Sequence, residues 1–133
     1  MIYFDTNVLV YFSIDQDPKK LDLARRYIFE AIEKEQFFIS TLVMSEYIFV
    51  LSKLQVLAEQ SDKVEFFFHF AKDVIHTKAV EEAYGLCREI NDCRKINDAI
   101  HCVAAARHCR KLVTFDKDYK KFGSVSLEIE ILS

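Results

Sequence analysis

The fold is decided by two stretches of sequence, IYFDTN (residues 2–7) and LVTFD (residues 112–116). In each stretch a short apolar run leads to an aspartate, Asp5 or Asp116. The carboxyl ends of the strands in an open α/β sheet face the crevice where such folds bind ligands. If the two strands are neighbours, the two carboxylates converge there. Two unit charges about 4 Å apart repel by about 4 kcal/mol at an effective dielectric of about 20, so a divalent cation is expected to compensate.

Short apolar runs alternate with segments of helical spacing along the rest of the chain. We expect strands at residues 2–4, 37–39, 74–75, 112–115 and 125–129. We expect Asp17, Ser40 or Thr41, Ser61 and Thr77 to cap the N-termini of helices, with Pro18 as the first helical residue after Asp17. We expect Asn97 or a near neighbour to open a further helix, residues 98–109. A short helical turn is expected around Tyr119. The alternation predicts a three-layer α/β/α sandwich with a mainly parallel central sheet, and the length predicts a single domain, residues 1–133.

The composition restricts the function without naming it. Hydrophobic residues make up 51% of the chain, which is enough for a hydrophobic core. The net charge of −3 gives no overall indication of nucleic-acid binding. No apolar run approaches the roughly 18 residues that span a bilayer, and residues 1–4 lack the basic start of a signal peptide, so we expect a cytoplasmic protein. A local basic face could still come from the C-terminal half. Its basic residues are Arg88, Arg94, Lys95, Arg107, Arg110, Lys111, Lys117, Lys120 and Lys121.

The four cysteines are expected to be reduced and not to bind zinc. There is no Cys-x-x-Cys motif, although His101-Cys102 and His108-Cys109 place two histidine–cysteine pairs seven residues apart. On one helix seven residues span about 10.5 Å, whereas each zinc ligand lies about 2 Å from the metal. We therefore interpret these residues as structural or surface positions.

Four acidic residues stand where apolar segments begin, end or are interrupted: Asp5, Glu46, Asp98 and Asp116. The three aspartates could simply cap helices or turns. Glu46 differs because its neighbours at helical spacing are mostly apolar, so its carboxylate must be neutralised, paired or bound to metal. The joint arrangement is the stronger signal, because it combines two strand ends, one helix start and one apolar helix face.

The ordered set of motifs resembles a PIN domain. Asp5-Thr6-Asn7 follows the first strand, Glu46 lies on a mid-chain helix, Asp98 opens an alanine-rich helix and TFDKDY (residues 114–119) follows a late strand. The resemblance covers residue 1 to about residue 122 and is greatest to the small ribonuclease toxins of toxin–antitoxin modules, the VapC-like group. It implies a parallel sheet flanked by helices, and one or two Mg²⁺ or Mn²⁺ ions that serve the hydrolysis of RNA phosphodiester bonds.

We assign Asp5 and Asp98 as the principal metal ligands. Glu46 and Asp116 are expected to complete the site directly or through metal-bound water. Three neighbours, Thr6, Asn7 and Thr114, are expected to orient the carboxylates. Asp118 is interpreted as the cap of the following turn.

Other functions fit the residues less well. A haloacid-dehalogenase-type phosphatase needs a second aspartate two positions after the first, and position 7 is asparagine. A receiver-type phosphoacceptor would want a lysine after a late strand, where Asp116 stands instead. The remaining alternative is a catalytically inactive PIN-like scaffold that binds RNA or protein, which the complete acidic set disfavours.

The resemblance also implies partners: an RNA substrate, a cognate antitoxin that places a basic side chain at the acidic pocket, and a second copy in a homodimer. From the lack of a long apolar run we expect no membrane partner. The chain is rich in aromatic residues, with twelve Phe and six Tyr. Tyr11, Phe12, Tyr47 and Phe49 are candidates for an interface and equally for the core.

Overall fold

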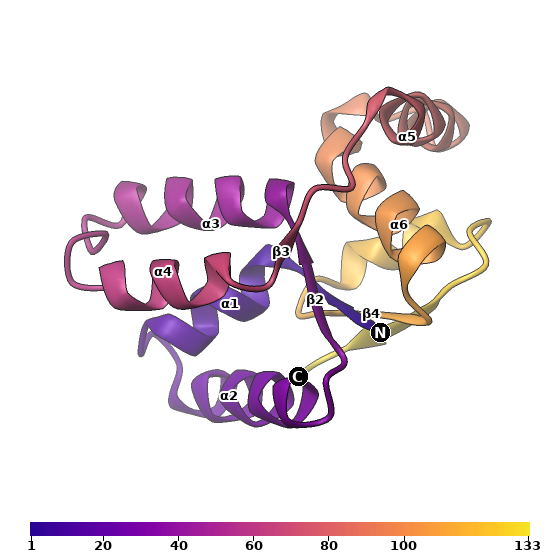
Figure 1. Cartoon of the computed structure of the whole chain (residues 1–133). Helices are drawn as coiled ribbons and strands as arrows, with labels where there is room; N and C mark the ends of the chain where they lie inside the picture. Colours follow the sequence, from indigo (N-terminus) through magenta and orange to yellow (C-terminus); the bar gives the residue numbers. More distant parts are fainter.

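The computed structural model describes residues 1–133 as a five-stranded parallel sheet with helices packed around it (Figure 1). The strands lie in the order β3-β2-β1-β4-β5, and all four pairings are parallel. The chain therefore moves from β1 toward one edge of the sheet and then crosses to the other side of β1. The predicted sandwich with a parallel central sheet is confirmed.

The strands and helices alternate as expected. The strands are β1 (Ile2–Phe4), β2 (Phe37–Ser40), β3 (Ala71–Lys72), β4 (Lys111–Thr114) and β5 (Glu128–Ile131). The α-helices are α1 (Thr6–Ser13), α2 (Pro18–Glu33), α3 (Thr41–Lys53), α4 (Ser61–Phe68), α5 (Thr77–Glu89) and α6 (Ile96–His108). Two 3-10 helices, η1 (Cys93–Lys95) and η2 (Lys117–Phe122), complete the chain. No helix combines the length and the apolar character that crossing a membrane requires.

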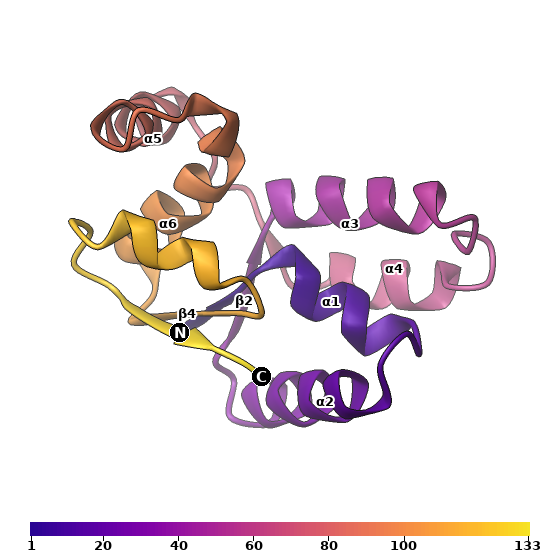
Figure 2. The same cartoon turned by 180° about the vertical axis from the view of Figure 1, so that it is seen from behind.

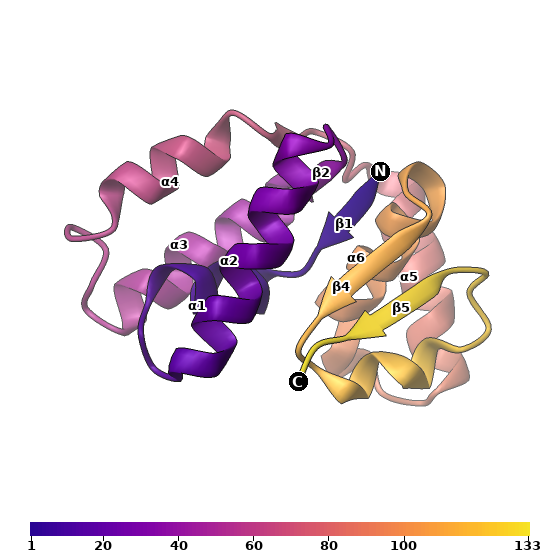
Figure 3. The same ribbon diagram turned by 90° about the horizontal axis from the view of Figure 1, so that it is seen from below.

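The helices form two groups. Helices α1 to α4 gather on one side of the molecule, while α5 and α6 pack against each other beside β4 (Figures 1 and 2). Seen from below, β1, β4 and β5 run side by side, with α1 to α4 beyond β1 and with α5 and α6 behind β4 and β5 (Figure 3). The sheet order reverses between β1 and β4, which makes their carboxyl ends the topological switch point where such sheets bind ligands.

Two of the four aromatic residues considered for an interface, Phe12 and Tyr47, lie in the hydrophobic core. Phe67 of α4 lies with its ring centroid 5.2 Å from that of Phe12, 5.9 Å from that of Phe37 and 5.6 Å from that of Tyr47. These rings are fully or almost fully buried, so Phe12 and Tyr47 belong to the core and not to an interface. Phe49, by contrast, is 66% exposed.

Several predicted boundaries are wrong, mostly at the sheet edges. The third strand is Ala71–Lys72, not residues 74–75, and the last is Glu128–Ile131, not residues 125–129. An edge strand has a single neighbour, so its register with that neighbour decides its position more than its own apolarity does. Ile39 pairs with Ala71, and Ile129 pairs with Leu112. The fourth strand begins and ends one residue earlier than expected.

Some predicted caps are also wrong. Gln60 and His76 occupy the N-cap positions of α4 and α5, so Ser61 and Thr77 are the first helical residues. Helix α6, by contrast, begins at Ile96, the residue next to Asn97, as expected. Asp116, and not Asp118, caps η2, because its Oδ1 accepts a hydrogen bond from the Asp118 backbone N–H at 2.9 Å. Asp118 instead pairs with Lys95 at 3.3 Å.

The Asp17 cap of α2 is as expected and yields a stability prediction. Its Oδ1 accepts hydrogen bonds from the backbone N–H groups of Lys19 at 3.1 Å and Lys20 at 3.3 Å. Asp17→Ala should lower the free energy of unfolding by about 1 kcal/mol, because both donors lose their protein partner. Urea denaturation would measure this change. Asp22→Ala on the exposed side of the same helix is the control, and an equal change in both variants would contradict the capping role.

Candidate functional site

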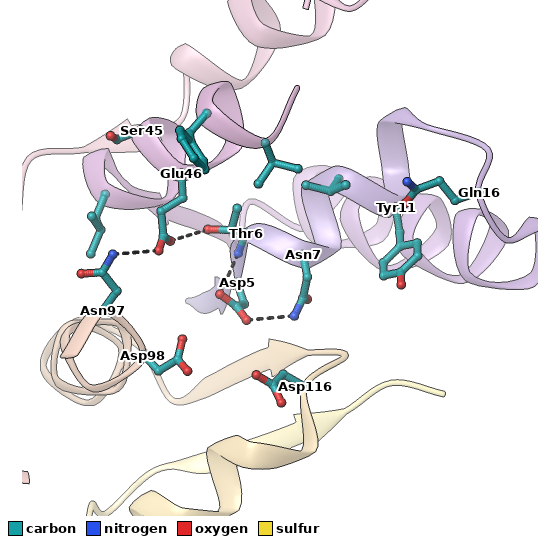
Figure 4. Close-up of a pocket in the computed structure, with 14 residues that line it drawn as sticks. Asp5, Thr6, Asn7, Tyr11, Gln16, Ser45, Glu46, Asn97, Asp98 and Asp116 are labelled. Atoms are coloured by element: carbon teal, nitrogen blue, oxygen red, sulfur yellow. Dashed lines mark hydrogen bonds between the residues drawn. The ribbon is translucent and has the colours of Figure 1, made fainter. Parts of the chain in front are cut away.

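A pocket of about 670 Å³ opens at the carboxyl ends of β1 and β4. All four acidic residues singled out in the sequence border it: Asp5, Glu46, Asp98 and Asp116 (Figure 4). No lysine or arginine does so. The pocket therefore collects four carboxylates from four separate parts of the chain and provides no cationic side chain in its wall.

Asp5 is held in place by three protein donors. It follows β1 directly, caps α1 through a hydrogen bond from the Thr6 backbone N–H to Oδ1 at 2.8 Å, and is buried. Its Oδ2 accepts hydrogen bonds from Thr114 Oγ1 at 2.7 Å and from Asn7 Nδ2 at 3.1 Å. Asn7 is fixed in turn because its Oδ1 accepts from the Phe115 backbone N–H at 3.1 Å. These contacts leave Oδ1 of Asp5 with spare acceptor capacity toward the pocket.

Glu46 is paired within the protein. It lies in the second turn of α3, and its Oε1 accepts hydrogen bonds from Thr6 Oγ1 at 2.7 Å and from His101 Nε2 at 2.6 Å. Its Oε2 accepts one from Asn97 Nδ2 at 3.1 Å. The expectation that this carboxylate needs neutralisation or a partner is met by neighbours on α1 and α6.

Asp98 and Asp116 have fewer protein donors. Asp98 is the third residue of α6, and its Oδ1 accepts a hydrogen bond from the Tyr119 hydroxyl at 3.3 Å. Asp116 accepts only the capping hydrogen bond from the Asp118 N–H. Both carboxylates point toward the space in front of Asp5 (Figure 4). Each keeps one oxygen to which no protein group donates.

The electrostatics of the pocket reflect crowded negative charge. Burial, together with the nearby charges of Asp5 and Asp116, raises the pKa of Asp98 from 3.8 to about 6. Burial likewise raises the pKa of Asp5, although His101, Thr114 and Thr6 partly oppose the shift. Burial acts in the same direction on Glu46, but the hydrogen bond and the charge of His101 outweigh it, so the pKa of Glu46 is lowered.

The donor set fits a hard divalent cation such as Mg²⁺ or Mn²⁺. Each of the four carboxylates keeps acceptor capacity toward the pocket, and oxygen ligands are those such ions prefer. A cation would also relieve the repulsion that raises the pKa of Asp98. Ligand atoms of Asp5, Glu46 and His101 lie within 4.8 Å of one another, which brings a histidine to the same place.

Sequence reasoning missed two residues that bind Glu46. His101 was interpreted as a structural or surface residue, and Asn97 only as a helix start, yet both donate to this carboxylate. One signal was available, since His101 follows Asp98 by three residues and so shares its helix face. Thr6 was expected to orient a carboxylate, and it donates to Glu46 through its hydroxyl and to Asp5 through its backbone N–H.

Comparisons with known proteins agree with this geometry. The family model described as "PIN domain" matches residues 2–125. Comparison with curated proteins gives no match. Among solved structures, VapBC2 from Rickettsia felis, bound to a DNA fragment from its promoter, aligns with a TM-score of 0.70 at 20% identity and covers 100% of both chains. FitAcB from Neisseria gonorrhoeae aligns with a TM-score of 0.69 at 16% identity over 98% of this chain and 96% of that chain. At these TM-scores and low identities, the likeness shows a shared fold alone.

Proposed function

The chain belongs to the PIN domain family, and from this membership and the acidic pocket we propose that it is a metal-dependent endoribonuclease. The observation that carries the proposal is the meeting of four carboxylates in a pocket whose wall contains no lysine or arginine. Such a site suits phosphodiester hydrolysis, because the substrate is itself an anion and needs positive charge beside it.

Asp5 and Asp98 would hold the cation, with Glu46 and Asp116 completing the site directly or through water. When bound, Mg²⁺ or Mn²⁺ would neutralise charge on the phosphodiester oxygens and activate a water molecule. The chain's own residues keep the carboxylates in place. Thr114 and Asn7 fix Oδ2 of Asp5, which leaves Oδ1 for the pocket.

The surroundings of the pocket support an RNA substrate. Tyr11 lines the pocket, and Lys20 Nζ lies 4.9 Å from the centroid of its ring. Phe49 lines it as well and is largely exposed. The half-buried ring of Tyr11 beside a lysine could contact a phosphate, and the exposed ring of Phe49 could stack on a base of a single strand.

We further propose that the protein, as a single PIN-like nuclease domain of residues 1–133, is the toxin of a toxin–antitoxin pair. Similar structures are the toxin–antitoxin complexes VapBC and FitAB, which supports a cognate antitoxin as partner. A basic side chain of the antitoxin would form ion pairs with the carboxylates of the pocket and neutralise part of their charge. A homodimer and a cytoplasmic location also remain predictions.

RNA cleavage by the purified protein tests the proposal. We expect cleavage with Mg²⁺ or Mn²⁺, complete loss of cleavage when a chelator removes the ion, and recovery when the ion is restored. Cation binding without cleavage of any RNA offered would favour the alternative, an inactive PIN-like scaffold that binds RNA or protein. Cleavage that persists in the chelator would contradict the metal-dependent chemistry.

A further inference from the structure

A buried chain of polar side chains runs from the start of α3 to Glu46. The Tyr3 hydroxyl hydrogen-bonds to Ser40 Oγ at 2.7 Å and to His101 Nδ1 at 2.7 Å. His101 Nε2 then contacts Glu46 Oε1 at 2.6 Å. Tyr3, Ser40 and His101 are all fully buried. Burying a polar group costs free energy unless the group is paired, so the loss of one hydrogen bond in this row of side chains would destabilise the others.

These hydrogen-bonded side chains join the elements that carry the carboxylates. Tyr3 lies on β1, which ends at Asp5, and His101 lies on α6 with Asp98. Ser40 ends β2 and caps α3, the helix of Glu46, because its Oγ accepts from the Val43 backbone N–H at 3.2 Å. A displacement of any one element would therefore stretch a buried hydrogen bond.

The chemistry of Glu46 decides what His101 does. An ionised carboxylate only accepts hydrogen bonds, so the 2.6 Å contact requires a hydrogen on Nε2. A nitrogen that carries a hydrogen has no lone pair for a metal. With Thr6 also donating, both lone pairs in the plane of Oε1 are occupied. Oε2, which accepts only from Asn97, is therefore the oxygen of Glu46 that would be open to a cation.

We propose that His101, backed by Tyr3 and Ser40, is a positioning residue that orients the Glu46 carboxylate, and that its Nε2 is a hydrogen donor and not a metal ligand. The inference rests on the proposed metal-dependent function. It adds a role for three residues that do not line the pocket.

Calorimetric titration of the protein with Mn²⁺ distinguishes three roles for His101: a hydrogen-bond donor to Glu46, a metal ligand, or a side chain that only fills space. His101→Asn, too short to reach Glu46, should weaken Mn²⁺ binding about 10- to 100-fold, the usual cost of losing a residue that supports a metal ligand. His101→Gln places an amide N–H near the position of Nε2 and should stay within about threefold of wild type. Tyr3→Phe should weaken binding by roughly 2- to 10-fold, the equivalent of one neutral hydrogen bond.

Tyr47→Phe is the matched control. Tyr47 is an equally buried tyrosine whose hydroxyl pairs with Ser13 at 2.5 Å, with no bond to the His101 chain. This variant should bind Mn²⁺ as wild type does, although it too loses a buried hydroxyl. If His101 only fills space, all four variants would bind Mn²⁺ with wild-type affinity. If His101 is a metal ligand, His101→Gln would bind as weakly as His101→Asn. Either result overturns the inference.

A second measurement needs no variant. Nitrogen-15 spectra of the His101 ring in the Mg²⁺-loaded protein should show a hydrogen on Nε2, and a bare Nε2 would overturn the inference. The two proposals fail differently. Wild-type protein that binds no Mn²⁺ would refute the proposed function, whereas normal wild-type binding with unchanged variants would refute only the role of His101.

Discussion

Replacing Asp98 by asparagine should cost about 100- to 1,000-fold in metal-dependent RNA cleavage and at the same time stabilise the metal-free protein. The substitution keeps the shape of the side chain and an oxygen that can accept from the Tyr119 hydroxyl. It removes the negative charge of a proposed principal ligand. Loss of activity with a gain of stability is the signature expected of a residue kept for function.

The sign of the stability change follows from the pKa of Asp98. Burial and the charges of Asp5 and Asp116 raise this pKa from 3.8 to about 6. Between these values folded Asp98 binds a proton that the unfolded chain releases, so the contribution of Asp98 to the stability of the metal-free wild type should fall as pH rises from about 4 to 7. Allowing for solvent screening, Asp98→Asn should gain about 1 to 2 kcal/mol at pH 7.

Chemical denaturation at pH 4 and pH 7, in a chelator, would measure this gain. Asp22→Asn, an exposed aspartate on α2, is the control and should change neither activity nor the pH dependence. An active Asp98→Asn protein, or one less stable than wild type at pH 7, would contradict the assignment of Asp98.

The affinity for Mn²⁺ should decrease about tenfold between pH 7 and pH 5. A carboxylate must lose its proton before it binds a metal, and Asp98 changes from mostly ionised to mostly protonated across a pKa of about 6. Binding at pH 6 should therefore release protons. The hydrogen-bonded Glu46, whose pKa is lowered, should add nothing in this range.

Titration calorimetry at several pH values, in buffers that differ in ionisation enthalpy, would measure both the affinity and the proton release. Asp22→Asn should reproduce the wild-type profile. An affinity that does not change with pH would show that no ligand titrates near pH 6, and Asp98 would then be excluded from the metal site.

The centre of the sheet was predictable because its strands are decided by local sequence. Residues 2–4 are apolar and end at Asp5, and β1 has these bounds. At the edges the pattern was less decisive, since β3 contains only Ala71 and Lys72, and a residue as apolar as Val74 lies outside it. Pairing with β2 fixes the position of β3, and that information is not local.

The gathering of the four acidic residues was expected from the resemblance to PIN domains and, for Asp5 and Asp116, on the condition that their strands are neighbours. The pairing of β1 with β4 meets that condition. His101 could not be assigned in this way. Its partners Tyr3 and Glu46 lie 98 and 55 residues away in sequence, so its role emerges only when β1, α3 and α6 are packed. Taken alone, the pattern around His101 is that of a buried helix face.

Anomalous diffraction from crystals soaked in Mn²⁺ would locate the cation on which the whole account depends. We predict a manganese peak in the pocket within bonding distance, about 2 Å, of carboxylate oxygens of both Asp5 and Asp98 and of no nitrogen of His101. Absence of a peak there at a Mn²⁺ concentration that supports cleavage, or a peak bound to other residues, would contradict it.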